Sequence, residues 1–82
     1  MVSAVMQQHL AELTQRVDRH VHAEAGRVSP AQQGLIRDQI IRKIGRMKWV
    51  DEYVIATALL LLRHEQPDLF SEQAAVEHNS QE

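Results

Sequence analysis

The sequence predicts an all-α fold, a small three-helix bundle that is completed by dimerisation or by docking onto a partner. Three observations lead to this prediction. Apolar residues recur at helical spacing in three segments, helix-capping residues separate these segments, and the chain has only 82 residues. A domain of this length gains only about 3–5 kcal/mol from its own core. Because the chain has no cysteine for a disulfide, association with another surface is the expected source of further stability.

The first helix is expected over residues 2–25. Its apolar positions follow one another at intervals of three or four residues, which places them on one stripe about 100° wide. The stripe resembles a heptad seam, so the helix is suited to pairing with another helix. Gly26 is placed to end it in a left-handed cap. The stripe consists of Val2, Met6, Leu10, Leu13, Val17 and Val21.

The second helix is expected over residues 30–47. Ser29 offers a side-chain oxygen as N-cap, Pro30 suits the first helical position, and Gln32 completes a capping box. Gly45 weakens the helix, and a kink or an end is expected near it. The predicted buried stripe consists of Ile36, Ile40, Ile44 and Met47, with Ile41 at its margin.

The third helix is expected over residues 51–66, from an N-cap at Asp51 to the residue before Pro67. Its apolar side chains point in every direction, because residues 59–62 are four consecutive leucines. Two companion helices shield only part of such a helix. A three-helix monomer would therefore expose an apolar strip of the kind that marks an interaction site.

Residues 1–67 are expected to form the helical domain, and residues 68–82 an acidic tail. Within this tail, residues 71–77 have the composition of a short fourth helix, and the final residues are expected to be disordered.

The charges are strongly segregated along the chain. Residues 27–48 carry six basic side chains against one acidic, a net charge of +5, whereas residues 49–82 have a net charge of −6. The net charge of the whole chain is only −2. The segregated charge has three candidate uses: pairing within the protein or its dimer, recognition of an acidic protein, and contact with nucleic-acid phosphates.

The leading interpretation is a non-enzymatic regulator, adaptor, inhibitor or chaperone that binds a larger protein or forms a homodimer. Leucines of the third helix would supply the apolar contact, together with whichever of Ile41 and Trp49 is exposed, and cations of the second helix would orient an acidic partner. The alternative is a dimeric nucleic-acid-binding regulator that uses the basic outer face of the second helix. The predicted partner-binding residues are Arg42, Lys43, Arg46, Leu59, Leu60 and Leu62.

No catalytic, cofactor or metal site is predicted. The sequence has no Gly-x-Ser-x-Gly elbow and no phosphate-binding Gly-x-x-x-x-Gly-Lys loop. The five histidines are interpreted as surface or boundary residues; His9 and His20 would lie about 16 Å apart on one helix, too far for a shared ion. The longest apolar run, residues 53–62, is half of what a membrane span needs. We expect a cytoplasmic protein without a signal peptide.

Overall fold

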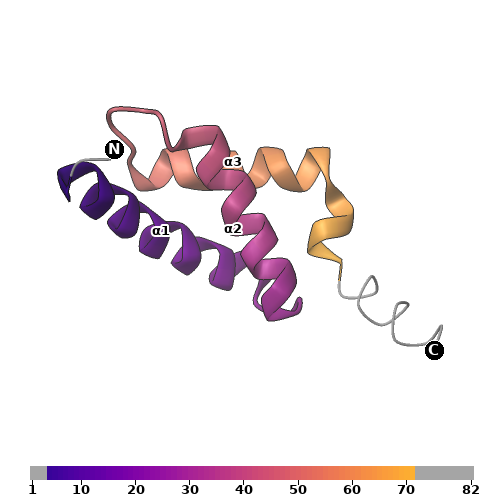
Figure 1. Ribbon diagram of the computed structural model, residues 1–82. Helices are drawn as coiled ribbons and strands as arrows, with labels where there is room; N and C mark the ends of the chain where they lie inside the picture. Colours follow the sequence, from indigo (N-terminus) through magenta and orange to yellow (C-terminus); the bar gives the residue numbers. More distant parts are fainter. Residues whose placement is uncertain (1–3, 72–82) are drawn as a thin grey trace.

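The computed structural model describes residues 4–71 and shows three α-helices followed by a short 3₁₀-helix (Figure 1). The helices are α1 (Ala4–Ala25), α2 (Pro30–Ile44) and α3 (Glu52–Glu65), and the 3₁₀-helix is η1 (Pro67–Phe70). These residues include no strand, which confirms the predicted all-α bundle. None of the helices described has the length and apolarity that crossing a membrane requires.

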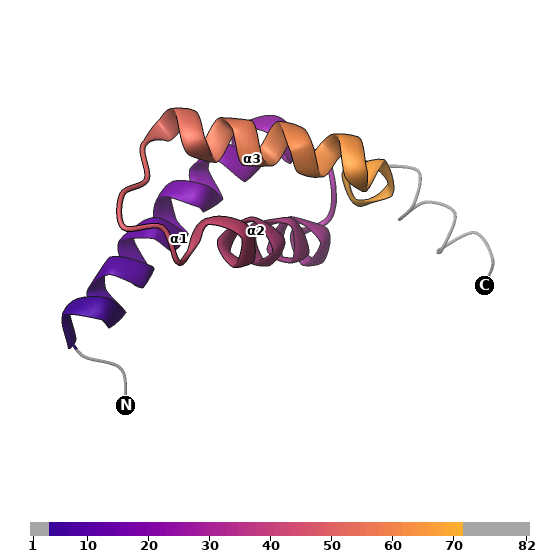
Figure 2. The same cartoon turned by 90° about the horizontal axis from the view of Figure 1, so that it is seen from above.

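α1 extends beyond the other two helices at its N-terminal end (Figure 2). Its 22 residues span about 33 Å, against about 22 Å for the 15 residues of α2. The predicted apolar stripe is therefore buried only in its C-terminal part, at Leu13, Val17 and Val21. Met6 and Leu10 lie on the extending part and are exposed.

α2 begins at the predicted cap. Ser29 Oγ accepts a hydrogen bond from the backbone N–H of Gln32 at 3.2 Å, and Pro30 is the first helical residue. The side-chain amide of Gln32 donates to the carbonyl oxygens of Leu69 and Ser71, at 3.3 and 3.4 Å. The capping residue pair thus starts the helix and also ties the end of the described chain to it.

α2 ends at Ile44, three residues before the predicted bound at residue 47 and next to Gly45, where a kink or an end was expected. The backbone N–H of Gly45 donates to Ile41 O at 2.7 Å, and the chain then leaves the helix. Met47, predicted to belong to the buried stripe, lies beyond the helix and is exposed. That prediction is wrong because the helical period does not continue past Gly45.

Gly26 follows α1 as predicted, but the left-handed cap is not formed. No residue within positions 4–71, glycine included, has a positive φ. Glycine is needed here for space instead, since a Cβ atom at Gly26 would lie 2.5 Å from the carbonyl oxygen of His22.

The core is built from apolar side chains of all three helices and of both connecting segments. Among the described residues no polar or charged side chain is buried with them. The core consists of Leu13, Val17, Val21, Ala25, Val28, Ile36, Ile40, Ile44, Val50, Ile55, Ala58, Leu59 and Leu62.

η1 extends the packed unit beyond the predicted domain end at residue 67. Leu69 and Phe70 are half-buried and pack against the core. The sequence did not predict this 3₁₀-helix. Apart from Ser71, the predicted short helix over 71–77 and the rest of the acidic tail lie outside the described residues, as does Val2.

Candidate interaction surface

α3 has one buried face and one outward face, and both are apolar. α1 and α2 pack against the side that carries Ile55 and Leu62. The opposite side carries Tyr53, Leu60 and Leu61, with exposed fractions of 77, 68 and 53%. Tyr53 and Leu60 are seven residues apart, which aligns them along the helix two turns from each other.

Two of the leucines predicted to bind a partner belong to the core instead. Leu59 and Leu62 have exposed fractions of 4 and 0%. At 100° per residue they share the side of α3 with Ile55 and Ala58, which faces the other two helices. The prediction of an uncovered position is wrong for these two, and only Leu60 of the three lies on the outward face.

The structure adds Tyr53 and Leu61 to the outward face, and the sequence prediction did not include them. The spacing from Tyr53 to Leu60 contained the signal, because residues seven apart share a helix face. It could not show which side of the leucine run is outward, since that depends on where α1 and α2 lie.

The predicted basic residues are exposed at the C-terminal end of α2 and in the turn after it. Lys43 Nζ lies 2.9 Å from Glu65 Oε1 of α3. Arg42 and Arg46 are exposed and make no ion pair with any residue in 4–71. Of the three, Lys43 is the one that contacts α3.

An apolar groove runs between the C-terminal end of α2 and the outward face of α3. Its volume is about 260 Å³. Lys43 provides its only charged side chain. The groove is lined by Lys43, Ile44, Tyr53, Val54, Thr57, Ala58 and Leu61.

A smaller hollow of about 170 Å³ lies on the other side of α3, toward α1. Its charged side chains are already engaged with neighbours. Arg63 Nη1 lies 3.9 Å from Glu24 Oε2, and its guanidinium carbon lies 5.6 Å from the centroid of the Phe70 ring. The hollow is lined by His20, Glu24, Ala56, Leu59, Leu60, Arg63 and Phe70.

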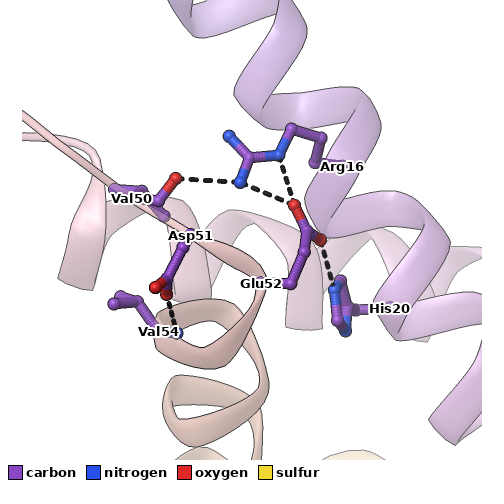
Figure 3. Close-up of polar contacts among 6 residues, drawn as sticks. All are labelled: Arg16, His20, Val50, Asp51, Glu52 and Val54. Atoms are coloured by element: carbon purple, nitrogen blue, oxygen red, sulfur yellow. Dashed lines mark hydrogen bonds and ion pairs between the residues drawn. The ribbon is translucent and has the colours of Figure 1, made fainter.

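The N-terminal end of α3 is fixed to α1 by Glu52 (Figure 3). Glu52 Oε1 lies 2.6 Å from Nη2 of Arg16, and Glu52 Oε2 lies 2.7 Å from Nε2 of His20. Arg16 also donates to the backbone carbonyl of Val50 at 2.8 Å. These contacts hold α3 at a defined position against the middle of α1.

Asp51 and Glu52, the two acidic residues at the start of α3, make different contacts. Asp51 is the predicted N-cap, and its Oδ1 accepts a hydrogen bond from the N–H of Val54 at 2.9 Å. The hydrogen bond with His20, followed by that with Arg16, lowers the pKa of Glu52 below its ordinary value of 4.5. The carboxylate of Glu52 is thereby kept in its charged form.

The histidines form no metal site in the described part of the chain. Within residues 4–71, no three His, Asp or Glu side chains come together in a way that could hold a metal ion. His20 is half-buried and pairs with Glu52. This pair was not predicted, because its members are 32 residues apart in the chain.

Trp49 and Ile41 were the two residues whose exposure the sequence left open. Ile41 is half-buried and packs against the core. Trp49, in the segment between α2 and α3, is exposed. Trp49 therefore adds to the apolar surface near the start of α3.

Comparison of the chain with protein-family models, with curated proteins and with solved structures finds no match.

Proposed function

We propose that the chain is a non-enzymatic interaction protein of the cytoplasm that binds a larger protein through the outward face of α3. The observation that carries the proposal is the exposure of Tyr53, Leu60 and Leu61 on one side of a helix. Apolar surface gathered in this way is typical of protein interaction sites.

Burial of this face would supply a driving force for binding. Full burial of a leucine side chain contributes about 1.5–3 kcal/mol relative to its exposure. Leu60 and Leu61 are more than half exposed, so much of that contribution is available to a partner. The fixed position of α3 against α1, through Glu52, limits the ordering cost of binding.

The positive charge at the end of α2 favours binding of an acidic partner over a neutral one. Arg42, Lys43 and Arg46 are exposed at the C-terminal end of α2 and in the turn after it. Charges at the rim of an interface raise the association rate and fix orientation more than they raise affinity. The partner's contact surface would therefore combine apolar and acidic side chains.

A dimeric nucleic-acid-binding regulator is the second candidate. It is favoured by Arg42 and Arg46, which make no ion pair within the described residues. Their replacement by alanine would then weaken binding uniformly across sequences and reduce its dependence on salt.

Affinity capture from a lysate of the source cells tests the proposal. Wild-type protein is compared with Leu60→Glu and with Leu35→Glu, a control on the N-terminal half of α2 that is also exposed, each with and without nuclease. We expect a protein that survives nuclease and is lost only with Leu60→Glu. Recovery of nucleic acid alone would contradict the proposal and favour the second candidate.

A further inference from the structure

We propose that the groove between α2 and α3 binds an amphipathic helix of another protein, one whose apolar ridge is flanked by acidic side chains. The inference rests on the proposed function and adds to it the place of contact and the chemistry of the partner.

The α3 side of the groove has the geometry of a hole that receives a side chain from a facing helix. Val54, Thr57, Ala58 and Leu61 line it, and these residues stand at positions i, i+3, i+4 and i+7. Four residues in this arrangement form the hole of knobs-into-holes packing between helices. The matching occupant is therefore a helix that inserts a side chain at this point.

The sizes of the lining residues make the hole a depression rather than a flat face. Thr57 and Ala58 are small and lie at its centre, while Tyr53 and Leu61 stand on either side along the helix. Ala58 is buried and Leu61 is half exposed. A leucine-sized side chain entering between Tyr53 and Leu61 would contact apolar atoms on several sides.

The α2 side of the groove leads into a basic segment at the end of α2. Residues 42–48 contain four cations and no acidic residue. Lys43 lines the groove and already binds a carboxylate, that of Glu65, at 2.9 Å. Arg46, two residues beyond the end of α2, has no acidic partner in the described chain. Acidic side chains on the incoming helix would pair with these cations.

The α1 side of α3 lacks such a charge excess. There Arg16 pairs with Glu52, and Arg63 lies near Glu24. The α2 side of α3 is therefore the side next to a segment in which cations outnumber acidic residues, residues 42–48. This difference directs the acidic flank of the partner to the α2 side.

The probes for the test are two fluorescent helical peptides with the same leucine ridge, one flanked by glutamates and one by lysines. Binding to the full chain is measured by anisotropy, and methyl-resolved NMR locates the contact. We expect the acidic peptide to bind at least about tenfold more tightly than the basic one. The methyl signals of Val54, Thr57 and Leu61 should shift on binding.

Matched variants separate the groove from the rest of the surface. Leu61→Glu should weaken binding at least about tenfold, while Leu35→Glu, at the same exposed fraction of 53%, should leave it nearly unchanged. Arg46→Glu should weaken binding of the acidic peptide, and Arg19→Glu, an exposed cation of α1, should weaken it less. Circular dichroism verifies that each variant is folded.

Three results would overturn the inference. The first is no binding of either peptide, or equal binding of both. The second is a protein captured from the lysate that depends on Leu60 but not on Leu61 or Arg46, which leaves the proposed function standing. The third is a homodimer in sedimentation that Leu61→Glu dissociates, which would make a second copy the occupant.

Discussion

The carboxylate of Glu52 lies 2.7 Å from Nε2 of His20, although 32 residues separate the two in the sequence. Arg16, one turn before His20 on α1, contacts the other carboxylate oxygen. The first residue of α3 is thereby joined to two consecutive turns of α1. The pair joins the two helices at the surface, where the Glu52 side chain is 60% exposed, while the burial of Ile55 and Leu62 against α1 and α2 decides which leucines face outward.

Stability should fall at acidic pH in a manner that depends on Glu52. Its pKa is lowered in the folded protein from an ordinary value of 4.5. A carboxyl group with a lowered folded pKa contributes stability above its unfolded pKa, and loses that contribution as the pH falls through the folded value. We expect the urea midpoint of the wild type to decline below about pH 4.5, and Glu52→Gln to remove part of the decline.

Glu12→Gln is the matched control for this titration. Glu12 is exposed on α1 and makes no ion pair with the residues described. Its replacement should leave the pH profile of the urea midpoint close to that of the wild type. Equal effects of the two substitutions would show that Glu52 makes no special contribution.

The sequence predicted the helices well because their signals are local. Ser29 and Asp51 cap the predicted starts through backbone groups three residues away. The outward face of α3 could not be predicted in the same way. It depends on which side of α3 the other two helices cover, and local periodicity contains no information about contacts between residues far apart in the chain.

Alanine substitutions within the leucine run of α3 should differ strongly in how much they destabilise the protein. Leu62→Ala removes a side chain that is fully buried, and such substitutions cost about 2–5 kcal/mol. Leu60→Ala shortens a side chain on the outward face and should cost less than about 0.5 kcal/mol. Urea unfolding followed by circular dichroism gives both free energies.

The same pair of variants tests which face of α3 is buried and which is outward. If Leu60→Ala were the more destabilising of the two, α3 would be rotated relative to this structure, and Leu60 would belong to the core. The proposed binding surface would then be misplaced.

Removal of the N-cap of α3 should cause a measurable loss of stability. Asp51→Ala eliminates the oxygen that accepts the N–H of Val54 at 2.9 Å and should cost about 1 kcal/mol. Asp51→Asn retains an acceptor and should recover most of the loss. A similar loss in both variants, measured by urea unfolding, would mean that the charge of Asp51 matters more than its hydrogen bond.

The cations of α2 show which part of the candidate surface was accessible to sequence analysis. Arg42, Lys43 and Arg46 were predicted to be exposed, and they are. Pairing of the basic and acidic segments within the protein was one predicted use of the segregated charge, and Lys43 and Glu65 form one such pair. Which two residues meet could not be predicted, because it depends on how α2 crosses α3. A residue's polarity indicates its exposure, but only the fold decides its neighbours.

Two glycines of this chain should respond to alanine in opposite directions. Gly34 lies inside α2, and a Cβ atom there would meet only the end of the Arg37 side chain at 3.8 Å. Gly34→Ala should therefore stabilise the protein by about 0.5–1 kcal/mol, the difference in helix propensity. At Gly45 an added Cβ would lie 2.5 Å from the backbone carbonyl oxygen of Ile41, which cannot move without disturbing the end of α2. Gly45→Ala should destabilise by more than about 1 kcal/mol, and thermal and urea unfolding of both variants would show the two signs. Stabilisation by Gly45→Ala would indicate that α2 can continue toward residue 47, the predicted bound of the helix.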